Sequence, residues 1–120
     1  MAGKYDTIRM ITYLMKECFQ KKLEIKKVEN YIEISDNILI FRKKIHELIE
    51  ENKVLEDYSS EQLDKLTKLC VYKFNKINEF CNENKIDIKD ADKCYETSKN
   101  PQEFMLRLIM LVNDKIKIDK

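Results

Sequence analysis

The alternation of apolar and polar positions is helical along most of the chain and is most pronounced over residues 100–117. Asn100 can cap a helix there, Pro101 suits the first helical position, and Glu103 is placed to bond back to the cap. At about 100° per residue, the apolar residues that follow cover a continuous arc of nearly half the helix. The arc consists of Phe104, Met105, Leu108, Ile109, Leu111, Val112 and Ile116. We expect a helix this apolar to be surrounded by other helices or covered by a partner.

Three further segments repeat their apolar residues every three or four positions. Residues 7–22 and residues 60–84 each predict one amphipathic helix, and Ser59 and Gln62 have the spacing of a capping box before the second. A short helix is expected after Asp87, which can cap it. Because the apolar positions of 60–84 continue without interruption, they predict one long helix.

Residues 24–52 leave two structures open. Their apolar residues follow a helical period, which is interrupted by a short polar segment that begins with Ser35, a good N-cap for a new helix. The alternative is a β-hairpin, with the isoleucine-rich segments 31–34 and 38–41 as strands. Hairpin turns of this kind prefer glycine where the chain has Asn37. The helical interpretation is therefore favoured, as one kinked helix or as two.

The composition also favours helices. The chain has 120 residues, a length typical of one domain; 43% of them are hydrophobic and 38% are charged, as in helices with polar outer faces. Gly3 is the only glycine and Pro101 the only proline, whereas sandwiches and barrels need frequent turn residues of these types. We expect an all-α fold, a single-domain bundle of about four to five helices spanning residues 1–120.

Charge and the length of apolar runs argue against several kinds of partner. The 23 Lys and Arg nearly balance the 22 Asp and Glu, so a net charge of +1 gives no global attraction to nucleic acid or to anionic membranes. The longest apolar run is far short of the roughly 20 residues that span a bilayer, and no signal peptide is evident. Four cysteines without such a signal indicate reduced thiols, so we expect a cytoplasmic protein.

Patterns that carry catalysis or bind metals are few. Glycine loops that bind phosphate are absent, and His46, the only histidine, has no evident nucleophile or orienting group. The cysteines, Cys18, Cys70, Cys81 and Cys94, include no close pair of the kind that structural zinc uses, and they fall on apolar stripes. No Glu-x-x-His motif exists for a di-iron site. We expect no enzyme activity, cofactor, metal site or small-molecule substrate.

Two surfaces are candidate binding sites. Leu106 and Met110 lie outside the apolar arc of residues 100–117, which favours contact with another protein or with a second copy. The leading hypothesis is a helical interaction module: an adaptor, an inhibitor or immunity-type protein, or a small subunit of a larger complex. The alternative is a nucleic-acid-associated subunit, since lysines beside an aromatic ring can hold a phosphate backbone and a base. Its candidate residues, on one side of the helix predicted over 60–84, are Lys65, Lys68, Tyr72, Lys73 and Lys76.

Overall fold

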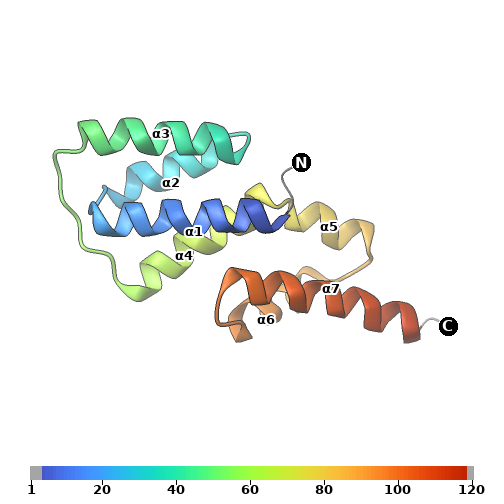
Figure 1. Cartoon of the computed structure of the whole chain (residues 1–120). Helices are drawn as coiled ribbons and strands as arrows, with labels where there is room; N and C mark the ends of the chain where they lie inside the picture. The colour runs from blue at the N-terminus through green and yellow to red at the C-terminus, as the bar shows by residue number, and fades with distance from the viewer. Residues whose placement is uncertain (1–3, 119–120) are drawn as a thin grey trace. The chain divides into compact units, whose positions relative to one another are not determined.

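The computed structural model describes residues 4–118, and the side chains of residues 6–114. Within that range the regular elements are seven α-helices, with no strand. They are α1 (Lys4–Gln20), α2 (Ile25–Ile34), α3 (Ile38–Glu51), α4 (Ser60–Phe74), α5 (Ile77–Glu83), α6 (Ile88–Thr97) and α7 (Pro101–Ile118), as labelled in Figure 1. The predicted all-α class is confirmed, but the predicted count of about four to five helices is wrong.

The helices belong to two compact units. The first, residues 1–75, holds α1 to α4, and the second, residues 76–120, holds α5 to α7. The single-domain organisation expected from the sequence stays a prediction.

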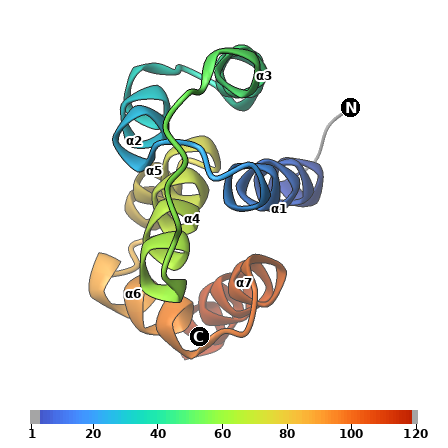
Figure 2. The same ribbon diagram turned by 90° about the vertical axis from the view of Figure 1, so that its left-hand side faces the viewer.

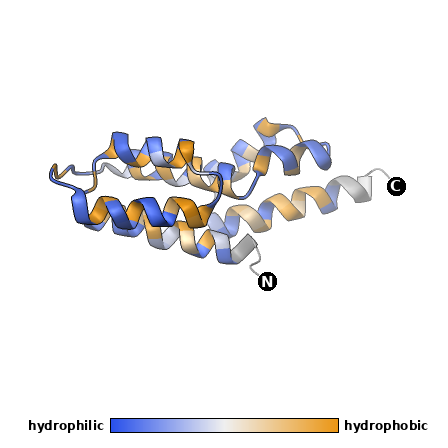
Figure 3. Ribbon diagram, turned by 90° about the horizontal axis from the view of Figure 1, so that it is seen from above, coloured by the Kyte–Doolittle hydropathy of each residue, from blue (hydrophilic) through white to orange (hydrophobic). Residues whose placement is uncertain are grey.

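In the first unit, α1 packs against α3 and α4, and α2 packs against the same two helices. Figure 2 looks along the axis of α3, and Figure 3 shows apolar and polar residues alternating along the helices of this unit that face the viewer. Phe41 of α3, which is fully buried, packs against the half-buried Phe74 of α4, with ring centroids 5.5 Å apart. The other fully buried side chains of the unit include Ile8, Ile11, Leu14, Cys18, Leu23, Val28, Ile45, Leu48, Leu66, Cys70 and Val71.

Helix α2 is capped at both ends by residues far away in the sequence. Its N-cap residue, Glu24, makes no side-chain capping bond, and no basic residue lies in its last turn. Instead the N–H of Glu24 donates to Asn52 Oδ1 at 3.2 Å, and the N–H of Ile25 donates to Glu56 Oε1 at 2.9 Å. At the other end, Lys73 of α4 donates from its Nζ to the carbonyl oxygens of Ile32 and Glu33. The connector 52–59 thus satisfies two N–H groups at the start of α2, and α4 satisfies two carbonyl groups at its end.

The segment 24–52 forms two helices and no hairpin. Asn37, rather than Ser35, caps the second of them: its side chain accepts from the N–H of Ile40 at 3.0 Å. Ser35 is the C-cap of α2; it is fully buried and donates from its hydroxyl to the carbonyl of Tyr31. The polar interruption was therefore predicted correctly as a break between helices, but the capping residue was not.

The single helix predicted over 60–84 is also wrong, because the chain breaks between α4 and α5. Lys76 has a left-handed backbone, with φ of 52°, which no α-helix accommodates. The apolar residues on either side keep their spacing of three and four, so periodicity could not reveal the break. The N-terminal capping box was predicted correctly: Ser59 and Gln62 each accept from the backbone N–H of the other.

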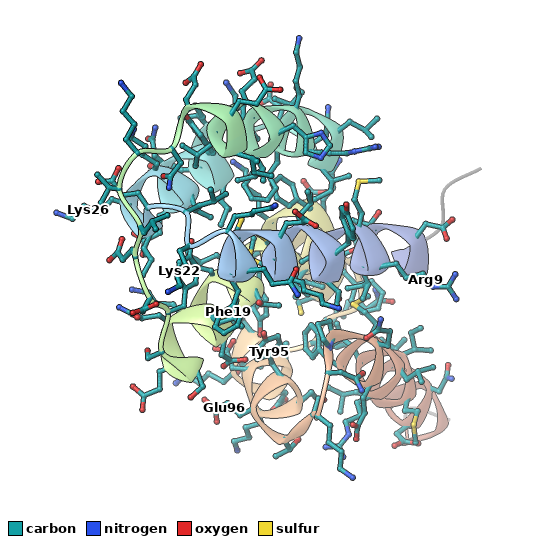
Figure 4. All side chains as sticks on the ribbon, turned by 60° about the vertical axis from the view of Figure 1, so that its left-hand side comes forward. Arg9, Phe19, Lys22, Lys26, Tyr95 and Glu96 are labelled. Carbon is teal, nitrogen blue, oxygen red and sulfur yellow. The ribbon has the colours of Figure 1, made fainter. Side chains whose placement is uncertain are left out.

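In the second unit, α6 packs against α5 and α7. Tyr95, labelled in Figure 4, extends from α6 to Phe104 of α7, and the two rings meet edge to face with centroids 5.1 Å apart. As predicted, Asp87 caps α6 by accepting from the N–H of Lys89 at 3.0 Å. These contacts bury one side of α7.

The start of α7 confirms the predicted cap and corrects its second half. Asn100 Oδ1 accepts from the N–H of Glu103 at 2.8 Å. Glu103 bonds back to the N–H of Lys99 at 3.0 Å, one residue before the predicted position. Its other oxygen pairs with Arg107 at 2.8 Å. The backbone bond from Lys99, together with Arg107, lowers the pKa of the Glu103 carboxyl.

The burial of Leu108 predicts the energetic importance of α7. Leu108 is fully buried, whereas Leu106 on the same helix is 51% exposed. Leu108→Ala should therefore lower the free energy of unfolding by about 2–5 kcal/mol, the usual range for a buried leucine. Leu106→Ala, the matched control, should cost less than about 1 kcal/mol because that side chain is already in water. Urea denaturation measures both, and equal losses would contradict this account of the core.

The backbone of Lys76 predicts an opposite effect of glycine at two nearby lysines. At Lys76, glycine should raise the free energy of unfolding by about 0.5–1 kcal/mol, since it adopts positive φ without a steric penalty. At Lys65, an exposed position inside α4, glycine should lower it by about 1 kcal/mol. If α4 and α5 formed one continuous helix, both substitutions would destabilise the protein to a similar degree.

Candidate interaction surfaces

Three large apolar side chains of α7 are exposed to solvent. Leu106, Ile109 and Met110 are 51%, 39% and 60% exposed, and their spacing places them on one side of the helix. We call these three residues the α7 outer face. Most of α7 is coloured as hydrophobic in Figure 3, in contrast to the alternating colours of α3. An exposed apolar cluster of this kind is typical of a contact with another protein.

The α7 outer face is wider than the sequence indicated. Leu106 and Met110 are exposed, as predicted. Ile109 is also exposed, although the sequence pattern assigns it to the apolar arc. Leu111 and Val112 of that arc are half-buried, and Ile116 lies outside the residues whose side chains are described. The core arc is therefore narrower than the run of apolar residues, because the neighbouring helices cover only Phe104, Met105 and Leu108 completely.

The lysine surface predicted on residues 60–84 is only partly assembled. Lys65, Lys68 and Tyr72 share one side of α4, and Lys68 Nζ lies 5.3 Å from the centroid of the Tyr72 ring. Lys65 is exposed, while Lys68 and Tyr72 are half-buried. Lys76 is not on α4, since it follows the helix break and belongs to the second unit.

Lys73 has a structural partner that the sequence could not reveal. Its ammonium group lies at the C-terminal end of α2, 2.7 Å from the carbonyl oxygen of Ile32 and within reach of that of Glu33. A cation at this end of a helix interacts favourably with the helix dipole. A phosphate would have to compete with these carbonyl groups for Lys73. The set of lysines available to bind nucleic acid is therefore smaller than the sequence predicts.

A second surface runs along α3 and was not predicted as a site. Its outward side carries six exposed residues that line a shallow groove: Leu39, Arg42, Lys43, His46, Glu47 and Glu50. We call them the α3 charged face. Basic residues come first along the helix and acidic residues last. In the part of the chain that the structure describes, none of the five ionisable side chains has an ion pair. The sequence does contain a signal for this face, namely the order of basic before acidic residues, but the spacing of apolar residues does not reveal it.

The cysteines are largely shielded from water, as their positions on apolar stripes predict. Cys18, Cys70 and Cys81 are buried, Cys94 is half-buried, and all four are free thiols. Burial raises the pKa of Cys18 to about 12, with a smaller contribution from Glu17. Burial is also the main cause of the raised pKa of Cys70, Cys81 and Cys94. Raised pKa values disfavour the thiolate, which is the form that attacks electrophiles and binds metals.

Metal-binding and membrane-spanning features are not found in the described residues. Among the side chains of residues 6–114, no three of His, Cys, Asp or Glu are grouped so that they could hold a metal ion. No helix within residues 4–118 combines the length and the apolar character needed to cross a bilayer.

Comparisons with protein-family models, with curated proteins and with solved structures find no match to this chain.

The buried thiol of Cys18 predicts how stability depends on pH. Above pH 9.0, the ordinary pKa of this thiol, the unfolded chain loses the proton while the native protein keeps it up to about pH 12. Between these values the native state binds more protons, so its stability falls as pH rises, by about 1.4 kcal/mol per pH unit. Cys18→Ala should remove this share of the slope, as measured by urea denaturation at pH 9 to 11.

The matched control is Cys94→Ala, which should change the slope less because this thiol is half-buried. An unchanged slope in Cys18→Ala would mean that Cys18 is not protected from water in the native protein.

Proposed function

We propose that the chain is a non-enzymatic helical interaction module that binds another protein through the α7 outer face. The observation that supports this is the exposure of Leu106, Ile109 and Met110 on one side of a helix whose other side is buried. Transfer of such side chains from water into a contact releases roughly 25 cal/mol per Å² of apolar surface. A small subunit of a larger complex, an adaptor and an inhibitor or immunity-type protein all fit this surface.

Two features make α7 suited to this role. Its first turn is fixed by the Asn100 cap and by the pair between Glu103 and Arg107. Arg107 also donates to Thr97 Oγ1 at 2.6 Å, which ties the helix to the end of α6. A surface presented on a preorganised helix loses little conformational entropy when it binds. We further propose a cytoplasmic location, in which the four thiols stay reduced.

The alternative function is association with nucleic acid through α4. The pair formed by Lys68 and Tyr72, together with Lys65, supports it, since a cation beside an aromatic ring suits a phosphate and a stacked base. The engagement of Lys73 and the separation of Lys76 from α4 reduce this support. We therefore place protein binding first.

Charge placed on the α7 outer face should separate the two functions. The double variant Leu106→Asp, Met110→Asp should weaken association with the protein partner at least about tenfold, because it puts two carboxylates into an apolar contact. The partner is captured from extracts of the source cells, identified by mass spectrometry, and then titrated with the purified variants. Circular dichroism at each step confirms that the variants are folded.

Two controls make the result interpretable. Tyr13→Asp adds a carboxylate at another exposed apolar residue, on α1, and should leave the association intact. Lys68→Glu with Lys65→Glu should also leave it intact, and the purified protein should have the 260/280 nm ratio of protein alone. If the folded aspartate variant keeps every partner while the lysine variant loses one, nucleic-acid association replaces protein binding as the function.

A further inference from the structure

The order of charges on α3 is unfavourable for the helix itself. The N-terminal end of a helix carries partial positive charge and the C-terminal end partial negative charge. On α3, however, Arg42 and Lys43 come early, Glu50 lies in the last turn, and the first turn has no acidic residue. The pair Lys43 and Glu47 also has the less favourable orientation for residues four apart. The isolated unit therefore gains nothing from this order of charges.

The same order is self-complementary when two copies of α3 lie antiparallel. If a twofold axis passes between His46 and Glu47, Lys43 of each copy faces Glu50 of the other. Lys43 and Glu50 each lie about 5 Å along the helix from the axis, at 1.5 Å per residue. The two helix dipoles are also antiparallel in this arrangement, so each acidic end lies beside a basic end.

Exposed apolar residues also occur near both ends of α3. Leu39 is 62% exposed before the basic residues. Val54 and Leu55, just after the helix, are 57% and 70% exposed. An antiparallel pair brings the Leu39 end of one copy to the Val54 end of the other, besides pairing Lys43 with Glu50.

We propose that the α3 charged face binds a second copy of this chain, as an antiparallel pair of α3 helices related by a twofold axis. Closed twofold dimers are the commonest assemblies of identical chains, and their interfaces are self-complementary in this way. The contact is distinct from the α7 outer face and does not depend on the function proposed for it. The 14 residues of α3 span only about 21 Å, so the buried area falls short of the standard ~800 Å² per partner. The dimer is therefore weak and sensitive to salt.

Charge reversal at Lys43 and Glu50 tests the proposed register. In Lys43→Glu the introduced carboxylate faces Glu50 of the other copy, and in Glu50→Lys the introduced ammonium group faces Lys43 of the other copy. Each single variant should therefore dimerise at least about tenfold more weakly. The double variant Lys43→Glu, Glu50→Lys restores opposite charges across the axis and should recover the dimer.

A mixture of the two single variants gives an independent test of the same register. The facing side chains at these positions are then two carboxylates on one copy and two ammonium groups on the other, so the mixed dimer should form. Neither Lys43 nor Glu50 has an intrachain ion pair in the described structure, so the fold should persist in every variant.

Sedimentation equilibrium at low salt, at protein concentrations up to about 1 mM, measures these weak dimers. Lys16→Glu, on the exposed side of α1, changes the net charge by the same amount as Lys43→Glu and should leave dimerisation nearly unchanged. The proposal is overturned if the wild type stays monomeric over this range or if the double variant fails to recover the dimer. It is also overturned if the aspartates on the α7 outer face abolish dimerisation while Lys43→Glu does not, because the second copy would then lie on α7.

Discussion

The capping of α2 by distant residues is the constraint on which the first unit depends. The helix has ten residues and no capping side chain of its own at its N-terminus, so it is marginal in isolation. Bonds from Asn52 and Glu56, which are 28 and 31 positions from their partners, satisfy one end. Lys73, about 40 positions away, satisfies the other. The stability of helix α2 is therefore coupled to the placement of the connector 52–59 and of α4.

This constraint also decides which surfaces are available for binding. Because Lys73 donates to carbonyl groups at the end of α2, fewer basic side chains on α4 are available to bind a ligand than the sequence implies. The core takes the other side of α3, where Phe41, Ile45 and Leu48 are buried, and so leaves its charged side in water. The position of the α3 charged face is thus a consequence of packing, whereas its order of charges is not required by packing.

The features that could be predicted from sequence are those with local causes. The caps formed by Ser59, Asp87 and Asn100 depend on bonds between residues two or three apart, and all three were predicted. The break at Lys76 was missed, since lysine is not a residue that signals a left-handed backbone and the apolar spacing continues across it. The role of Lys73 was missed because its partners lie on another helix. The exposure of Ile109 was also missed, because it depends on how much of α7 the neighbouring helices cover.

The two proposed contacts differ in their physical basis, and this difference gives them opposite responses to salt. The α7 outer face binds by removal of apolar surface from water, which salts such as sulfate strengthen. The contact proposed for the α3 charged face rests mainly on exposed ion pairs, which are screened as the Debye length falls to about 8 Å at physiological ionic strength. The contacts also lie on separate units of the chain, so one does not require the other. A rise in sulfate concentration should therefore dissociate two copies held by α3 while it preserves a partner held by α7.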